Sequence, residues 1–214
     1  REHCQLFFLH FTSAKYFRER TIHKISEGPA MNKWSQKRRI MRRYDLTAQL
    51  FDARYAEEQT LKYRAALEQL HIIGDSRVLD VGCGTGLLFN HVAGAEIIVG
   101  VDVSGKLLLQ AKERARSLRN VYLVQADADH LPFRDNSFSA VFTFTVLQNM
   151  PAPLETLKEI KRVAEFTAPI AVSGLKKAFA LHTFIELLEN AGLTAISFKD
   201  DNALKCYIAV SVQK

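Results

Sequence analysis

Alternate glycines follow an aspartate in the sequence Val-Leu-Asp-Val-Gly-Cys-Gly-Thr-Gly at residues 78–86. Glycine lets the backbone turn tightly and lets a ligand lie against it, because no Cβ stands in the way. The carboxylate of Asp80 is suited to accept hydrogen bonds from a ligand amino group, directly or through water; its alternative role is to cap the turn. The pattern predicts a site for a small polar ligand built on Gly82, Cys83, Gly84 and Gly86.

Two further aspartates follow apolar runs of strand length. Asp102 lies at the end of the run 96–103, next to Val103, and Asp127 follows the run 121–126. A carboxylate at the end of the second strand of such a unit accepts hydrogen bonds from both hydroxyls of a ribose. Leu87 stands where the dinucleotide fingerprint G-x-G-x-x-G has its third glycine. A nicotinamide-dependent oxidoreductase is therefore disfavoured, but it stays as an alternative because its cofactor also carries a ribose.

A parallel sheet would bring these three aspartates together. Apolar runs alternate with amphipathic segments between residues 77 and 175, and this alternation requires a parallel sheet with helices on both faces. Such sheets bind ligands at the carboxyl ends of their strands. The predicted strands are 77–81, 96–103, 121–126, 140–146 and 170–173, followed by an antiparallel pair at 193–198 and 206–212. The predicted helices span 57–70, 87–93, 106–118, 154–165 and 179–191.

Three motifs in this order and spacing resemble the class I S-adenosylmethionine-dependent methyltransferases. The first is Asp-x-Gly-x-Gly-x-Gly at 80–86. The second, Asp-Ala-x-x-Leu-Pro-Phe at 127–133, is typical of the methyltransferase type 11 group, with the ubiquinone and menaquinone C-methylases. The third, at 135–142, resembles the segment that precedes and begins the fourth strand of that group, here predicted at 140–146. The resemblance implies an α/β, Rossmann-like fold with a seven-stranded, mostly parallel sheet of order 3-2-1-4-5-7-6, whose last strand is antiparallel.

The resemblance also implies the cofactor, S-adenosyl-L-methionine. Asp80 would receive its α-amino group, Asp102 its ribose hydroxyls and Asp127 its adenine amino group, while the N–H of Ala128 meets the ring. Tyr44 or Tyr55, in the aromatic region 44–55, is expected to cover the methionine end; the alternative is that this helix packs on the sheet. Cys83 is expected to be a small filler rather than a nucleophile. The other predicted cofactor-binding residues are Gly82, Cys83, Gly84, Gly86, Val103, Thr145, Tyr44 and Tyr55.

A methyl acceptor is expected near the end of the strand 140–146. Gln148 and Asn149 follow this strand and are candidate substrate-orienting residues, but an amide is not a general base. The chain lacks the Asn-Pro-Pro-Tyr motif of enzymes that methylate amino groups of adenine or glutamine. No catalytic residue and no metal ligand are predicted; a base role for His130 is the alternative to a loop hydrogen bond.

The 214 residues are 48% hydrophobic and 24% charged, as in an ordinary globular protein, and three scattered cysteines argue against a disulfide framework. Residues 1–43 hold 11 Lys/Arg and 3 Asp/Glu, whereas the remainder holds 18 and 20. We expect an N-terminal extension at 1–30 that precedes a native start at Met31, a basic leader with N-terminal helices at 31–76, and a cofactor-binding core at 77–214. The alternative for the extension is a native additional helix near residues 12–24. With no apolar run long enough for a membrane helix, a cytoplasmic location is expected.

Several functions remain open on the sequence. We expect a methyltransferase that acts on RNA or protein, because the connections late in the chain are short and the leader is basic. The alternatives are a small-metabolite methyltransferase and a non-catalytic, cofactor-binding scaffold subunit, and the basic leader is equally explained as a solvated segment. A small activating partner subunit is expected to add a strand at the exposed edge 121–126.

Overall fold

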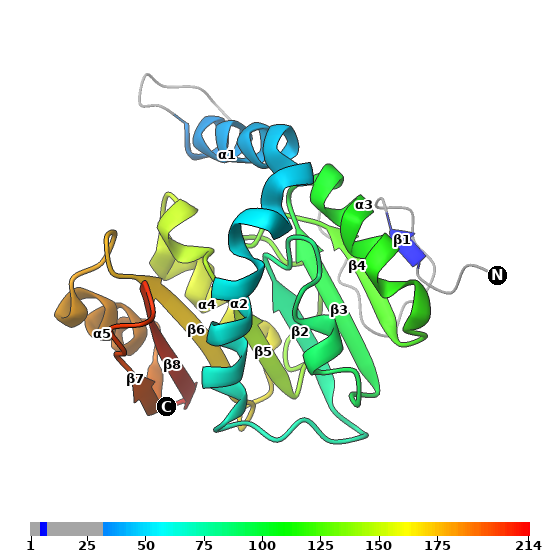
Figure 1. Ribbon diagram of the computed structural model, residues 1–214. Coiled ribbons are helices and arrows are strands. Elements are labelled where there is room, and N and C mark those ends of the chain that lie inside the picture. The colour runs from blue at the N-terminus through cyan, green and yellow to red at the C-terminus, as the bar shows by residue number, and fades with distance from the viewer. Residues whose placement is uncertain (1–4, 8–31) are drawn as a thin grey trace.

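The computed structural model describes the backbone of residues 5–7 and all of residues 32–214, which form one sheet with flanking helices (Figure 1). The sheet order is β1-β4-β3-β2-β5-β6-β8-β7. Neighbours from β1 to β6 are parallel, whereas β8 runs antiparallel to both β6 and β7. The strands are β1 (Gln5–Phe7), β2 (Arg77–Val81), β3 (Ile97–Asp102), β4 (Val121–Gln125), β5 (Ala140–Thr143), β6 (Ile170–Leu175), β7 (Leu193–Lys199) and β8 (Cys206–Gln213).

Five α-helices and four short 3-10 helices connect or flank the described strands. The hydroxyl of Ser104 accepts the N–H of Leu107 and so caps α3, and Gly192, with a φ of 75°, follows α5. The α-helices are α1 (Lys33–Thr47), α2 (Phe51–Leu67), α3 (Gly105–Arg114), α4 (Pro153–Val163) and α5 (Leu181–Asn190). The 3-10 helices are η1 (Ala48–Leu50), η2 (Phe89–His91), η3 (Ala115–Ser117) and η4 (Leu147–Asn149).

Alternation along each strand divides the core into two layers. Val78 of β2 packs in one layer with Ala66 of α2 and Leu108 of α3. The next residue, Leu79, points to the other face and packs in a layer with Leu157 of α4 and residues of α5. Helices therefore cover both faces of the sheet (Figure 1).

The predicted strand order is confirmed. Counting β2 to β8 as strands one to seven gives 3-2-1-4-5-7-6, with the last strand antiparallel. The parallel register sets Asp80 beside Gly100 and Asp102 beside Gln125. The carboxyl ends of β2, β3 and β4 therefore meet at one edge of the sheet.

Two predicted elements are shorter than expected. Instead of a helix over 87–93, only the turn η2 forms, where the ring of Phe89 lies against Gly86; a Cβ at Gly86 would be 2.3 Å from this ring. The strand predicted to reach residue 146 ends at Thr143, because Thr145 has a φ of 64°, which is incompatible with an extended strand.

The predicted extension at 1–30 supplies one strand of the sheet. β1 pairs in parallel with β4, so that Gln5 lies opposite Tyr122. The prediction of an exposed edge at 121–126 is therefore wrong, because the outer edge of β4 is already hydrogen-bonded to β1. The other residues of the extension lie outside the described residues. Among those described, no helix combines the length and apolar character needed to cross a membrane.

Candidate functional site

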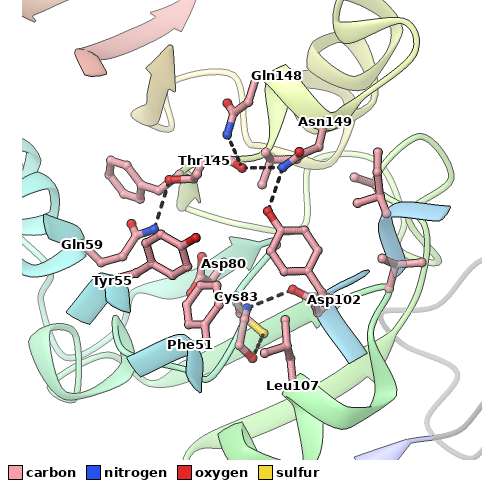
Figure 2. A pocket seen from close by; sticks show the side chains of 18 of the residues that line it. Phe51, Tyr55, Gln59, Asp80, Cys83, Asp102, Leu107, Thr145, Gln148 and Asn149 are labelled. Carbon is pink, nitrogen blue, oxygen red and sulfur yellow. Dashed lines mark hydrogen bonds between the residues drawn. The ribbon is translucent and has the colours of Figure 1, made fainter. Parts of the chain in front are cut away.

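A pocket of about 410 Å³ lies at the carboxyl ends of the central strands and is lined by residues of α1 and α2 as well (Figure 2). Asp80, Asp102 and Asp127 all line it, so the strands bring the three predicted aspartates to one cavity. Their individual roles toward a ligand stay predictions. The other predicted residues that line this pocket are Tyr44, Tyr55, Gly82, Cys83, Gly84, Val103, Ala128, Thr145, Gln148 and Asn149.

The loop after β2 requires glycine for its backbone shape and its packing. Gly82 has a φ of 75°, and a Cβ there would lie 2.3 Å from Cγ2 of Val146. Gly84 has a φ of 56°, and the ring of Phe51 lies against it. Gly86 is not among the pocket-lining residues; its missing Cβ makes room for a buried ring instead. Of the three alternate glycines, only Gly82 and Gly84 therefore line the pocket with their backbone.

Asp80 is a buried carboxyl group with an unpaired oxygen. The residue is 3% exposed, and no described group hydrogen-bonds to Oδ2. Burial raises the pKa of Asp80 to about 8, and the neighbouring charge of Asp102 adds to the rise. A buried acceptor without a donor is unfavourable in the free protein. A ligand ammonium would supply the missing donor and stabilise the carboxylate, which fits the predicted role toward an amino group.

Asp102 joins the glycine loop to the start of α3. Its Oδ2 accepts the N–H of Gly84 at 2.9 Å and its Oδ1 accepts the N–H of Ser104 at 2.8 Å. Burial raises the pKa of Asp102 to about 6, while these backbone hydrogen bonds oppose the rise. Each carboxylate oxygen keeps a further lone pair for a hydroxyl group, as a ribose site requires.

Asp127 has a partner that the sequence pattern did not reveal. Nζ of Lys37, on α1, lies 2.7 Å from both carboxylate oxygens of Asp127 and 2.5 Å from Oδ2 of Asp129. Lys37 is only 7% exposed, so a buried cation lies between two carboxylates. The basic run 33–43 pointed to this helix, but its spacing did not distinguish Lys37 from the exposed bases around it.

Aromatic rings from the N-terminal helices line the pocket. The ring centroid of Phe51 lies 5.1 Å from that of Tyr55 and 6.2 Å from that of Tyr44. The hydroxyl of Tyr44 accepts a hydrogen bond from Nδ2 of Asn149 at 3.1 Å. Both predicted tyrosines are thus at the pocket, together with Phe51, which the sequence analysis missed. Aromatic faces of this kind suit a cationic ligand group.

Thr145 adopts a left-handed conformation that is rare for a β-branched residue, and neighbouring groups hold it there. Its N–H donates to Oγ of Ser173 at 2.7 Å. Its carbonyl accepts from Nε2 of Gln148 at 2.7 Å and from Nδ2 of Asn149 at 3.0 Å. The two predicted substrate residues therefore fix this turn. Oε1 of Gln148 is buried and has no described partner, so it can still accept from a ligand.

Two polar residues of α2 also contact Thr145, and sequence reasoning missed both. Nε2 of Gln59 and Nζ of Lys62 donate to its Oγ1 at 3.0 and 3.1 Å. Lys62 is 1% exposed. Residues 59, 62 and 66 share one helical face, and Ala66 on that face is fully buried. Polar residues spaced on an apolar helical face were the available signal that these side chains point inward.

Cys83 and His130 are not placed for catalysis. Burial raises the pKa of Cys83 well above its ordinary value, so its thiol stays protonated, as expected of a small filler. His130 is exposed and does not line the pocket. Within residues 32–214, no three His, Cys, Asp or Glu side chains group together as metal ligands.

Residues 79–166 match the family model described as a methyltransferase domain. This part of the chain is similar to a methyltransferase domain. It contains most of β2 and all of β3, β4 and β5, whose carboxyl ends form the pocket, and the match agrees with the resemblance to class I S-adenosylmethionine-dependent methyltransferases.

Curated relatives are similar to this chain in sequence, and a solved structure shares its fold. The chain is 33% identical over 138 residues to a malonyl-[acyl-carrier protein] O-methyltransferase of Marinomonas sp. (strain MWYL1), covering 63% of this chain and 51% of that protein. It is 35% identical over 111 residues to a demethylmenaquinone methyltransferase of Staphylococcus haemolyticus (strain JCSC1435), covering 50% and 46%. The chain thus spans about half the length of these relatives. A SAM-dependent methyltransferase from Aquifex aeolicus shares the fold, with a TM-score of 0.64, 20% identity, and coverage of 71% of this chain and 89% of that one.

S-adenosylmethionine is the cofactor that the sequence predicts, and the residues of the pocket fit it. The unpaired Oδ2 of Asp80 is an acceptor for an α-ammonium group. At Gly82 the backbone lines the pocket without a side chain. Asp102 and Asp127 present carboxylates at the neighbouring strand ends for ribose and adenine donors.

Proposed function

We propose that this chain transfers a methyl group from S-adenosylmethionine to a small-molecule acceptor. The observation that carries the proposal is the unpaired, buried Asp80 in the same pocket as Asp102 and Asp127. When bound, the cofactor supplies a methyl group on a sulfonium, which is already an activated leaving group.

In this proposal the protein acts mainly by positioning. Asp80 binds the ammonium group and Asp102 the ribose hydroxyls. Asp127 accepts the adenine amino group while Lys37 holds its carboxylate in place. The turn at Thr145 sets the position of Gln148, whose free Oε1 accepts a hydrogen bond from the acceptor molecule.

We infer a small-molecule acceptor from the elements that line the pocket and from the names of the curated relatives. Residues of α1 and α2 line the pocket together with the strand ends, so the site is a pocket of about 410 Å³ with helices on its border, a form that suits a small acceptor. The curated relatives are named for demethylmenaquinone and for a malonyl group on its carrier. In the basic leader, Lys37 is buried in an ion pair and Arg43 donates to Oδ1 of Asn149 at 3.1 Å. Because Lys37 and Arg43 make contacts within the protein, fewer basic side chains of the leader are free to bind the phosphates of an RNA acceptor.

Transfer of a tritiated methyl group from S-adenosylmethionine into a fractionated extract tests the acceptor class. We expect label in the low-molecular-weight or lipid-soluble fraction. Label confined to RNA, or to protein other than an acyl group held on a carrier protein, would support the earlier prediction and contradict the small-molecule proposal. Cofactor binding with no label in any fraction would support a non-catalytic scaffold subunit.

A partner subunit at the sheet edge stays a separate proposal. Because β1 covers β4, such a partner would have to extend the sheet beyond β1 or displace it. Comparing the proteins that co-purify with the full chain and with a chain starting at Met31 tests this, since the shorter chain leaves β4 unpaired. The same set of proteins on both chains would argue against an interface at β4.

A further inference from the structure

One side of the pocket is lined by residues for which the predicted cofactor contacts leave no role. Glu58 and Lys62 come from α2, Leu175 ends β6, and Lys205 immediately precedes β8. In the sheet, β6 and β8 lie on the opposite side of β5 from β3 and β4, which carry the ribose and adenine carboxylates. This group of residues therefore lies at the end of the pocket away from the predicted adenine site.

This end of the pocket carries a net positive charge. The carboxylate of Glu58 is shared by two ammonium groups, with Oε1 2.9 Å from Nζ of Lys62 and Oε2 3.0 Å from Nζ of Lys205. Burial acts to raise the pKa of Glu58, but hydrogen bonds from both lysines outweigh it and lower the pKa. Glu58 is therefore a poor general base. Two cations and one anion leave one positive charge, part of it on the fully buried Lys62.

The hydroxyl of Thr145 also makes this end of the pocket suited to an electron-rich group. Its Oγ1 accepts hydrogen bonds from Gln59 and Lys62, both of which donate with their nitrogen atoms. The hydroxyl proton is then left to donate, and none of the described hydrogen bonds uses it. A hydroxyl that accepts from an ammonium group is polarised and becomes a stronger donor. The pocket thus contains a hydrogen-bond donor suited to an electron-rich oxygen.

We propose that this end of the pocket binds the methyl acceptor through an ionised oxygen, such as a carboxylate, phenolate or enolate. The Thr145 hydroxyl donates to that oxygen, and Lys62 and Lys205 compensate its charge. Tyr55 and Phe144 line the same pocket and provide apolar contacts for the rest of the acceptor. The inference rests on the proposed methyl transfer and explains how the reaction proceeds without a general base, since the acceptor is bound as its anion.

To test this, benzoate and its neutral analogue benzamide are each titrated calorimetrically into the full chain, which is first saturated with S-adenosylhomocysteine. We expect benzoate to bind at least about fivefold more tightly, as a partly screened charge pair would give. Lys205→Gln should reduce this preference without changing benzamide binding, and Lys62→Met should do the same. Lys205 is the more informative position because its side chain is 72% exposed, so its replacement leaves the core intact.

Lys199→Gln is the matched control. Lys199 forms a comparable surface pair with Glu68 at 3.1 Å and does not line the pocket, so its replacement should leave both probes unaffected. Equal or undetectable binding of benzoate and benzamide would overturn the inference. So would loss of S-adenosylhomocysteine affinity in Lys205→Gln, because the charge would then serve the cofactor carboxylate. If the unaltered chain fails to bind S-adenosylhomocysteine, the proposed function itself fails and this inference falls with it.

Discussion

A single oxygen of Asp80 shows how the fold prepares a ligand site. The residue lies in β2 between residues that pack in the core, so its carboxyl group is removed from water. No described donor reaches Oδ2, and burial raises the pKa to about 8. At neutral pH the carboxyl group of the free protein is therefore mostly protonated. Binding an ammonium group there must couple to the release of that proton.

We predict release of about one proton per cofactor bound at pH 7, because the bound ammonium favours the Asp80 carboxylate over its protonated form. Titrating S-adenosylmethionine calorimetrically in buffers of different ionisation enthalpy measures this number. Asp80→Asn should abolish the proton release and weaken binding. Identical binding enthalpies in all buffers for the unaltered chain would show that Asp80 does not change its charge on binding.

Gly82 gives a second prediction at the same scale. Gly82→Ala forces a side chain into a positive-φ conformation and brings its Cβ to within 2.3 Å of Val146. We expect a loss of about 2 kcal/mol in the free energy of unfolding and weaker cofactor binding. Gly74→Ala is the control, since nothing lies within 4 Å of the Cβ position there. Denaturant unfolding measures both, and an equal effect of the two substitutions would argue against a special requirement for glycine at 82.

At the scale of elements, α1 is attached to the pocket by polar contacts rather than by a large apolar face. Lys37 is its one buried residue, and it contacts Asp127 and Asp129. Asp45 near the carboxyl end of α1 accepts from the hydroxyl of Ser104. Tyr44 accepts from Asn149. The helix that lines the predicted adenine site therefore depends on one buried charge and a few hydrogen bonds for its position.

Lys37→Met should release α1 from the core, because it leaves Asp127 and Asp129 close together without a cation. Breaking a buried ion pair costs on the order of 3 kcal/mol. Hydrogen exchange over residues 33–47 should increase and cofactor affinity should fall. Arg39→Gln, at an exposed position of the same helix, should change neither. Unchanged protection of α1 in Lys37→Met would mean that other contacts determine its position.

For the whole molecule, the buried aspartates link stability to pH. The pKa of Asp80 is raised to about 8 and that of Asp102 to about 6. The folded chain therefore binds these protons more tightly than the unfolded chain does. Their contribution to stability is fully present below the ordinary aspartate pKa. It is lost as pH rises toward 6 for Asp102 and toward 8 for Asp80.

We accordingly expect the melting temperature of the cofactor-free protein to fall between pH 6 and pH 8 through the ionisation of Asp80. Asp80→Asn removes the titrating group and should flatten this part of the profile relative to the unaltered chain. Thermal unfolding followed by circular dichroism across this range gives the comparison. Parallel profiles for the two proteins would contradict the assignment of the pH dependence to Asp80.

Much of the fold was predictable because its signals are local. Buried parallel strands appear as continuous apolar runs; Asp80 lies within such a run, Asp102 near the end of the next and Asp127 directly after a third. The parallel order and the shared cavity then follow from topology. Local signals did not predict that the strand ends before Thr145. Contacts from Ser173 and Lys62 hold Thr145 in a left-handed backbone conformation, which no local pattern indicates. Local signals also failed at β1, which pairs with a strand more than a hundred residues away.

The sequence by itself determined the order of strands β2 to β8, the glycine loop and the convergence of Asp80, Asp102 and Asp127. Only the tertiary structure decided which side chains of the N-terminal helices enter the pocket. Lys37 meets Asp127 across 90 residues of sequence, and Lys62 meets Thr145 across 83. Helical periodicity shows which face of a helix is buried, but the partner of a buried charge depends on packing between distant segments. The charge at the acceptor end of the pocket is for this reason a property of the folded chain.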